Sequence, residues 1–64
     1  MEFKDSLKSL RKYLGVNQGV IAEHLNISVK TVSHWETGYS EPSVEQLKVL
    51  ADFFDVTIDE LVGR

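Results

Sequence analysis

Residues 16–38 read VNQGVIAEHLNISVKTVSHWETG and contain two helix starts eleven residues apart. Asn17 and Ser28 are side chains that cap a helix by accepting a hydrogen bond from a backbone N–H of its first turn. An apolar residue precedes each cap and another follows it by four positions, which is the hydrophobic staple that fixes how the chain enters a helix. The stretch therefore predicts one helix over Gln18–Leu25 and a second from Val29 to about Thr37.

The connection between these two helices is short, since only Asn26 and Ile27 lie between Leu25 and Ser28. Asparagine tolerates the left-handed backbone conformation in which helices commonly end. Ala22 is small enough for another helix to cross close by. The segment is therefore predicted to be a helix, a tight turn and a helix.

The second of these helices has a narrow apolar side, formed by Val32 and Trp35, and Trp35 is expected in the core. Its other side carries short, mostly polar side chains: Val29, Lys30, Thr31, Ser33 and His34. A helix of this kind is suited to lie in the major groove of DNA, where such groups meet base edges. DNA binding is the function that this stretch favours.

A further helix is predicted ahead of this stretch, from Glu2 to about Leu14, and Gly15 ends it. Its apolar residues recur at intervals of three and four positions, as expected for one buried face: Phe3, Leu7, Leu10 and Leu14.

Two more helices are predicted after Pro42, the first capped by Ser43 and the second by Thr57. Each start has the sequence of a capping box, with Gln46 and Glu60 three residues after the caps. The first of these helices has a core stripe consisting of Val44, Leu47, Leu50, Ala51 and Phe54. The whole chain is thus predicted to be all-α, with five helices.

Val49 and Phe53 form a second apolar stripe that a small core does not obviously need. They are either the far flank of a wide buried face or a surface for a partner, and the sequence leaves both open.

With 64 residues and no cysteine, the chain is expected to be a single domain, residues 1–64, without disulfides or thiolate metal sites. It has no apolar run of the roughly 20 residues that a membrane span requires, and a cytoplasmic location is expected. No nucleophile, base and orienting group occur in a recognisable set, so an enzyme is not expected. His24 has no second ligand one turn away, and neither metal, cofactor nor small-molecule ligand is predicted.

The formal net charge of −3 is unevenly distributed. Residues 1–34 hold five basic and three acidic side chains, whereas residues 35–64 hold two basic and seven acidic ones. The basic half contains the predicted helix-turn-helix. Phosphate neutralisation supplies most of non-specific DNA affinity, so such a chain is expected to bind DNA weakly as a single copy.

A resemblance to a known family is carried by the run Asn17–Ser28, Val32, Trp35-Glu36, Gly38, Glu41-Pro42-Ser43 and Asp59-Glu60-Leu61. In these the chain resembles the Cro/C1-type (XRE) helix-turn-helix family over almost its whole length. The resemblance implies a compact five-helix, lambda-repressor-like domain. It also implies a sequence-specific regulator, most simply a repressor that binds a palindromic operator on double-stranded DNA as a homodimer.

The resemblance also implies roles for individual residues. Gln18 matches a phosphate-binding position, and Arg11 with Glu36 matches a structural salt bridge behind the recognition helix. Thr37 and Gly38 match the point where backbone amides meet phosphates. DNA contacts from the recognition helix are implied for Ser28, Val29, Lys30, Thr31, Ser33 and His34.

Two departures from the family pattern concern DNA contact. Gly19 stands where relatives often carry a longer polar residue, and glycine inside a helix costs roughly 0.5–1 kcal/mol relative to alanine. The recognition helix also lacks Gln, Asn and Arg, which are effective bidentate readers of bases. Specificity is therefore expected to be modest for each half-site.

By the same resemblance, the dimer contact is expected at Pro42, Val44, Val56, Ile58 and Val62. The alternative function is a protein-interaction module of the same fold, of the antitoxin or antirepressor type, with weak DNA binding. The acidic second half and the Val49/Phe53 stripe favour this alternative, whereas the polar side of Val29–His34 favours the regulator.

Overall fold

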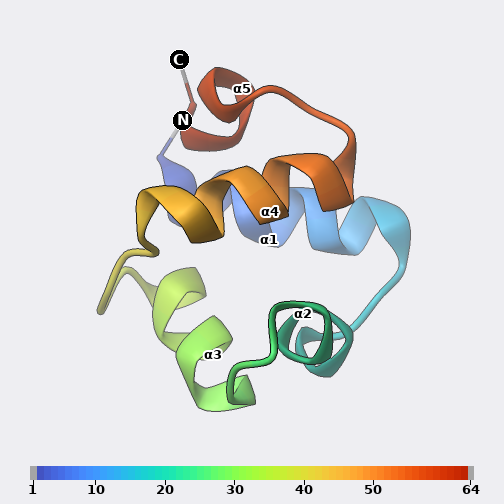
Figure 1. Cartoon of the computed structure of the whole chain (residues 1–64), viewed down its shortest axis with the longest axis vertical. Helices are drawn as coiled ribbons and strands as arrows, with labels where there is room; N and C mark the ends of the chain where they lie inside the picture. Colours follow the sequence, from blue (N-terminus) through green and yellow to red (C-terminus); the bar gives the residue numbers. More distant parts are fainter. Residues whose placement is uncertain (1, 64) are drawn as a thin grey trace.

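A computed structural model of the chain describes residues 2–63 and confirms the prediction of an all-α fold with five helices in this range (Figure 1). Met1 and Arg64, the ends of the predicted 1–64 domain, lie outside the described residues. The helices are α1 (Phe3–Leu14), α2 (Gln18–Leu25), α3 (Val29–Thr37), α4 (Val44–Phe54) and α5 (Ile58–Val62). Only the first start differs from the prediction, because Glu2 has extended backbone and precedes the helix.

The predicted helix caps are confirmed by hydrogen bonds. The side chain of Asn17 accepts from the backbone N–H of Val20 at 3.1 Å, and Ser28 accepts from that of Thr31 at 3.2 Å. Complete capping boxes begin α4 at Ser43 and α5 at Thr57. The caps matter most for α5, since a helix of five residues has few internal hydrogen bonds of its own.

The turn between α2 and α3 has the geometry expected from Asn26. This residue has φ 58° and ψ 48°, and the next backbone N–H, of Ile27, donates to the carbonyl of Ala22 at 2.9 Å. Asp55 ends α4 in the same left-handed conformation, with φ 56°. Two helix ends thus place a non-glycine residue where glycine is usually favoured.

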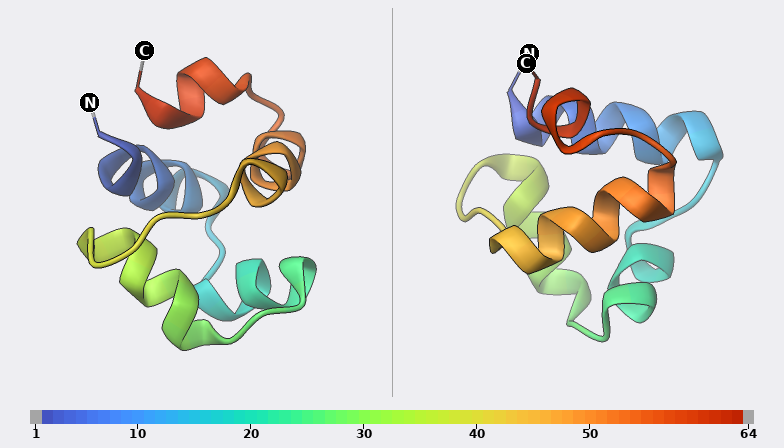
Figure 2. Two further views of the ribbon diagram at one scale, coloured as in Figure 1. Left: turned by 60° about the vertical axis from the view of Figure 1, so that its left-hand side comes forward. Right: turned by 45° about the horizontal axis from the view of Figure 1, so that its top comes forward.

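The helices are arranged so that α2 and α3 form one end of the molecule (Figure 1). Helices α1 and α4 cross the middle, and α5 lies at the opposite end. Helix α1 packs against both α3 and α5, so it joins the two ends. The further views in Figure 2 show the same separation of the helix-turn-helix from α5. No helix between Glu2 and Gly63 has both the length and the hydropathy that crossing a bilayer requires.

The core draws a buried side chain from every helix. Its largest fully buried members are Trp35, Leu7, Ile21, Leu50, Leu61 and Val32. Trp35 is 2% exposed, which confirms its predicted place in the core. Because Val32, Trp35 and Glu36 are buried, the opposite side of α3, with Val29 and Lys30, is turned toward solvent.

Two residues predicted to be buried are not. Leu14 is 46% exposed and Val44 is 65% exposed. Leu14 is the last residue of α1 and Val44 the first of α4, so each lies at a helix end that the neighbouring helices do not cover. Helical spacing identifies the face of a helix that is buried, but not how far along the helix the burial extends.

The second apolar stripe on α4 divides into two different environments. Phe53 packs on the core, with its ring centroid 5.1 Å from that of Phe54 and 4.7 Å from that of His24 on α2. Val49 is 38% exposed. Phe53 is therefore the flank of the buried face, and the stripe as a whole is not a free surface.

Candidate nucleic-acid interface

Helix α3 presents one accessible side, which carries the residues predicted to contact DNA. Val32, Trp35 and Glu36 are buried on the inner side. On the outer side Ser28, Val29 and Lys30 are exposed, and Thr31, Ser33 and His34 are partly exposed. Ser28, Val29 and Lys30 are therefore accessible to a partner, as a groove-binding helix requires.

Lys30 is available for a partner outside the chain. Within the described residues no carboxylate lies within 4.0 Å of its ammonium group. The hydroxyls of Ser28 and Thr31 lie 2.9 Å apart and share one hydrogen bond. Each hydroxyl has one hydrogen, so this pair keeps a single O–H that can be donated elsewhere.

An ion pair behind α3 joins the first three helices. Arg11 on α1 donates to Glu36 on α3 through Nε at 2.6 Å and Nη2 at 3.0 Å. Its Nη1 donates to the carbonyl of Val16 at 3.1 Å. Gln18, the first residue of α2, donates to the same carboxylate at 3.2 Å. The cluster therefore fixes the relative positions of both helices of the helix-turn-helix.

The protonation of Glu36 is determined by opposing effects. Burial acts to raise its pKa, but hydrogen bonds from Arg11 and Gln18, together with the charge of Arg11, outweigh burial and hold the pKa below its ordinary value. The same hydrogen bond raises the pKa of Arg11. Both groups are thus charged at neutral pH, and bidentate pairs of this kind are the strong ones.

Gln18 is positioned by this cluster at the N-terminus of α2. One of its two amide hydrogens is used by Glu36, and the other is left for an external acceptor. A helix N-terminus also favours anions. The phosphate contact expected of Gln18 stays a prediction, and the structure supplies an internal partner that orients the amide.

The donors at Thr37 and Gly38 are engaged within the chain. Thr37 Oγ1 donates to the carbonyl of His34 at 3.2 Å, and the Gly38 N–H donates to that of Trp35 at 3.4 Å. The N–H groups of Tyr39 and Ser40 also donate to His34, at 2.9 and 3.4 Å. Phosphate contacts through Thr37 and Gly38 remain a prediction that requires exchange of these internal hydrogen bonds.

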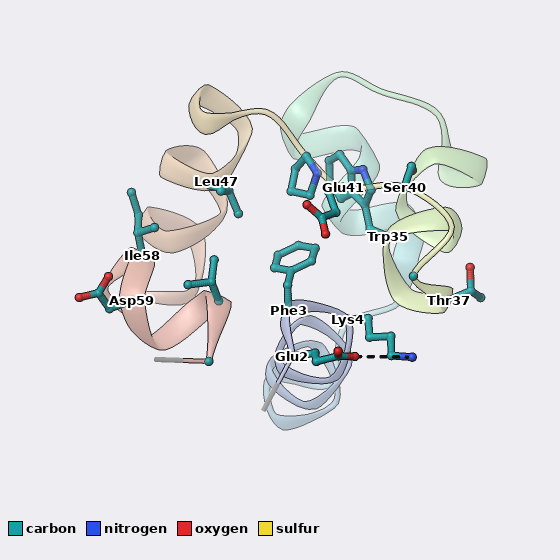
Figure 3. Close-up of a pocket in the computed structure, with 14 residues that line it drawn as sticks. Glu2, Phe3, Lys4, Trp35, Thr37, Ser40, Glu41, Leu47, Ile58 and Asp59 are labelled. Carbon is teal, nitrogen blue, oxygen red and sulfur yellow. Dashed lines mark ion pairs between the residues drawn. The ribbon is translucent and has the colours of Figure 1, made fainter.

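Sequence reasoning missed two side chains at this end of α3. Tyr39 is 79% exposed, and its ring centroid lies 4.6 Å from that of His34. Lys4 extends from the start of α1 toward the end of α3 (Figure 3), where its Cδ would lie 3.2 Å from a Cβ added to Gly38. The signal for Tyr39 was an aromatic residue directly after a helix-ending glycine.

The structure explains why glycine occurs at position 19 in this chain. A Cβ added at this position would lie 3.1 Å from Oδ1 of Asn17, the side chain that caps α2. The glycine therefore leaves room for the side chain of Asn17 that caps α2.

The comparisons with known proteins agree with this geometry. A family model described as Helix-turn-helix matches residues 7–61. The HTH-type transcriptional activator BcrR of Enterococcus faecalis is 44% identical over 63 residues, which are 98% of this chain and 31% of that protein. The chain spans 31–57% of the length of the curated relatives it matches.

Solved structures show the same fold. A transcriptional regulator from Listeria innocua is 40% identical, with a TM-score of 0.95, and the match covers 98% of this chain and 59% of that one. The P22 c2 repressor, solved with a synthetic operator, has a TM-score of 0.90 at 24% identity, and the match covers 98% of this chain and 96% of that one. Together with the matched model, these findings show that the chain belongs to the Cro/C1-type (XRE) helix-turn-helix family.

Proposed function

We propose that this chain is a DNA-binding transcriptional regulator that places α3 in the major groove. The observation that carries the proposal is the one-sidedness of α3: Val32, Trp35 and Glu36 are buried, whereas Val29 and Lys30 are exposed. A helix that packs on the core with one side and is accessible on the other can enter a groove without any unfolding of the domain. Membership of the family supports the same function.

The proposed contacts follow from the chemistry of each side chain. Lys30 donates to guanine O6 or N7, the acceptors that distinguish guanine in the major groove. Val29 and the methyl group of Thr31 pack on thymine methyls. Ser33 and His34 supply hydrogen bonds to base edges or phosphates, and Gln18 donates to a phosphate from the start of α2.

We further propose that the regulator binds a palindromic operator as a homodimer and acts as a repressor. Two copies related by a two-fold axis place their recognition helices in successive turns of the major groove, about 34 Å apart. Covering a promoter is the simplest regulatory action of such a dimer. The P22 c2 repressor, which shares this fold and was solved with a synthetic operator, supports the proposal of operator binding.

The dimer contact is proposed at the surface where apolar side chains remain accessible. Val44 is 65% exposed. Pro42, Ile58 and Val62 line an open groove of about 780 Å³ between the start of α1, the end of α3 with the loop after it, α4 and α5 (Figure 3). Val56, the fifth residue of the predicted surface, is partly exposed. Exposed apolar side chains of this kind gain stability when a second copy covers them.

The test is selection of bound sequences from a pool of random DNA duplexes. We expect a palindromic consensus whose half-sites are one helical turn apart. On the selected duplex Lys30→Ala is expected to lose about 1–3 kcal/mol of binding free energy. Lys48→Ala, which removes an exposed lysine of α4, is the matched control and is expected to bind like the unmodified chain. An interaction module without DNA function would select no consensus.

A further inference from the structure

We infer that Tyr39 is a DNA-binding residue of this chain, which donates its phenolic hydroxyl to a backbone phosphate and holds His34 in position. The inference rests on the proposed DNA-binding function and extends it beyond α3. No residue after Gly38 was assigned a role in DNA contact by the sequence.

The position of Tyr39 is fixed by the end of α3. Gly38 has φ 82°, which turns the chain back, and the N–H of Tyr39 donates to the carbonyl of His34 at 2.9 Å. The two rings then lie 4.6 Å apart with a tilt of 46°. Aromatic pairs at this separation attract each other. Lys30, His34 and Tyr39 thus follow one another along the outer side of α3, and Tyr39 extends that side past the helix.

A phosphate that binds at the end of α3 needs a side-chain donor, because the backbone donors there already make hydrogen bonds. The N–H groups of Gly38, Tyr39 and Ser40 and the hydroxyl of Thr37 all donate to carbonyls of α3. A phosphate arriving at this corner therefore finds no free backbone donor among these residues. The Tyr39 hydroxyl carries a hydrogen, and the residue is 79% exposed.

The second part of the inference concerns His34, which is partly exposed and stands one turn after Lys30. The ring of Tyr39 limits the rotamers of His34 before DNA arrives. Groups ordered in advance lose less conformational entropy on binding. Tyr39 therefore acts directly on phosphate and indirectly through the histidine.

The experiment measures binding of Tyr39→Phe and Tyr39→Ala to the selected duplex and to an unrelated duplex of equal length. Tyr39→Phe keeps the ring and removes the hydroxyl, so we expect about a five- to tenfold loss on both duplexes, because phosphates are common to all sequences. Tyr39→Ala also releases His34, so its loss is expected to be larger on the selected duplex. The control is Tyr13→Ala, which removes a tyrosine of α1 that is 87% exposed.

A second measurement identifies the phosphate and tests the coupling. A duplex in which one phosphate is replaced by a neutral methylphosphonate should bind the unmodified chain more weakly when the replacement is at one flanking position. The same replacement should leave the binding of Tyr39→Phe unchanged. The double variant His34→Ala/Tyr39→Ala should lose less binding free energy than the sum of the losses in the two single variants. Binding of both Tyr39 variants at the unmodified level overturns the inference alone. An unmodified chain that binds neither duplex overturns the proposed function with it.

Discussion

At the residue scale, Glu36 ties the recognition helix to α1 and α2. It is 4% exposed and pairs with Arg11, whose side chain is 16% exposed. Removing one partner of a buried pair leaves the other charge without compensation, which costs about 3 kcal/mol. A chain of this length has a total stability of roughly 3–10 kcal/mol. The loss is therefore a large part of what keeps the domain folded.

We expect Glu36→Gln to lower the free energy of unfolding by about 3 kcal/mol, measured by urea denaturation followed by circular dichroism. The matched control is Glu45→Gln, which breaks the exposed pair with Lys48 and is expected to change stability by less than about 0.5 kcal/mol. Equal effects of the two substitutions would contradict a structural role for the Arg11–Glu36 pair.

The same pair predicts a dependence of stability on pH. The folded pKa of Glu36 lies below its ordinary value of 4.5. The stability that the Glu36 charge contributes is therefore fully present above pH 4.5 and is lost as the pH falls through the folded pKa. Glutamine does not titrate. The stability difference between the unmodified chain and Glu36→Gln should therefore be constant from pH 7 to about 5 and narrow toward pH 3.

At the element scale, the helix ends were the part of the fold best predicted from sequence. Caps such as Asn17 and Thr57 act on backbone groups three residues away, so their effect is contained in the local sequence. Burial of Leu14 and Val44 was predicted wrongly because it depends on where other helices end. The engaged donors at Thr37 and Gly38 were also beyond sequence reasoning, since they depend on how the chain folds back at the end of α3.

The left-handed helix ends give an element-scale prediction. Asp55 has φ 56°, a conformation that glycine adopts at lower cost, and its charge lies at the negative end of the α4 dipole. Asp55→Gly is expected to raise the free energy of unfolding by about 0.5–1 kcal/mol. Urea denaturation measures the change.

Gly15→Ala is the converse substitution and tests the same reason. Gly15 has φ 74° and no neighbouring atom within 4 Å of an added Cβ. Only backbone strain opposes the alanine, so a loss of about 1–2 kcal/mol is expected. If Asp55→Gly is destabilising while Gly15→Ala behaves as stated, Asp55 has a stabilising contact that its left-handed conformation does not explain.

At the scale of the whole molecule, the charge distribution limits the affinity of one copy of the chain for DNA. Residues 35–64 hold seven acidic and two basic side chains. In α3, Lys30 is the only lysine or arginine, so each copy neutralises few phosphates and binds weakly. Joining two copies makes the second binding event intramolecular, which raises affinity by a factor of about 10²–10⁴ without new DNA contacts. The charge of the chain therefore favours the proposed dimer.

The proposed dimer can be tested at two exposed valines of α4. Val44→Asp puts a charge in the proposed dimer surface, and an acidic residue in the first turn of α4 is compatible with the helix dipole, so folding should be retained. We expect at least a tenfold loss of affinity for the palindromic duplex and little change for a duplex with a single half-site. Val49→Asp, farther along α4, is the control. Because each copy keeps its own DNA contacts, a loss equal on both duplexes would place Val44 in DNA binding instead, and no loss on the palindrome would exclude a dimer through this surface.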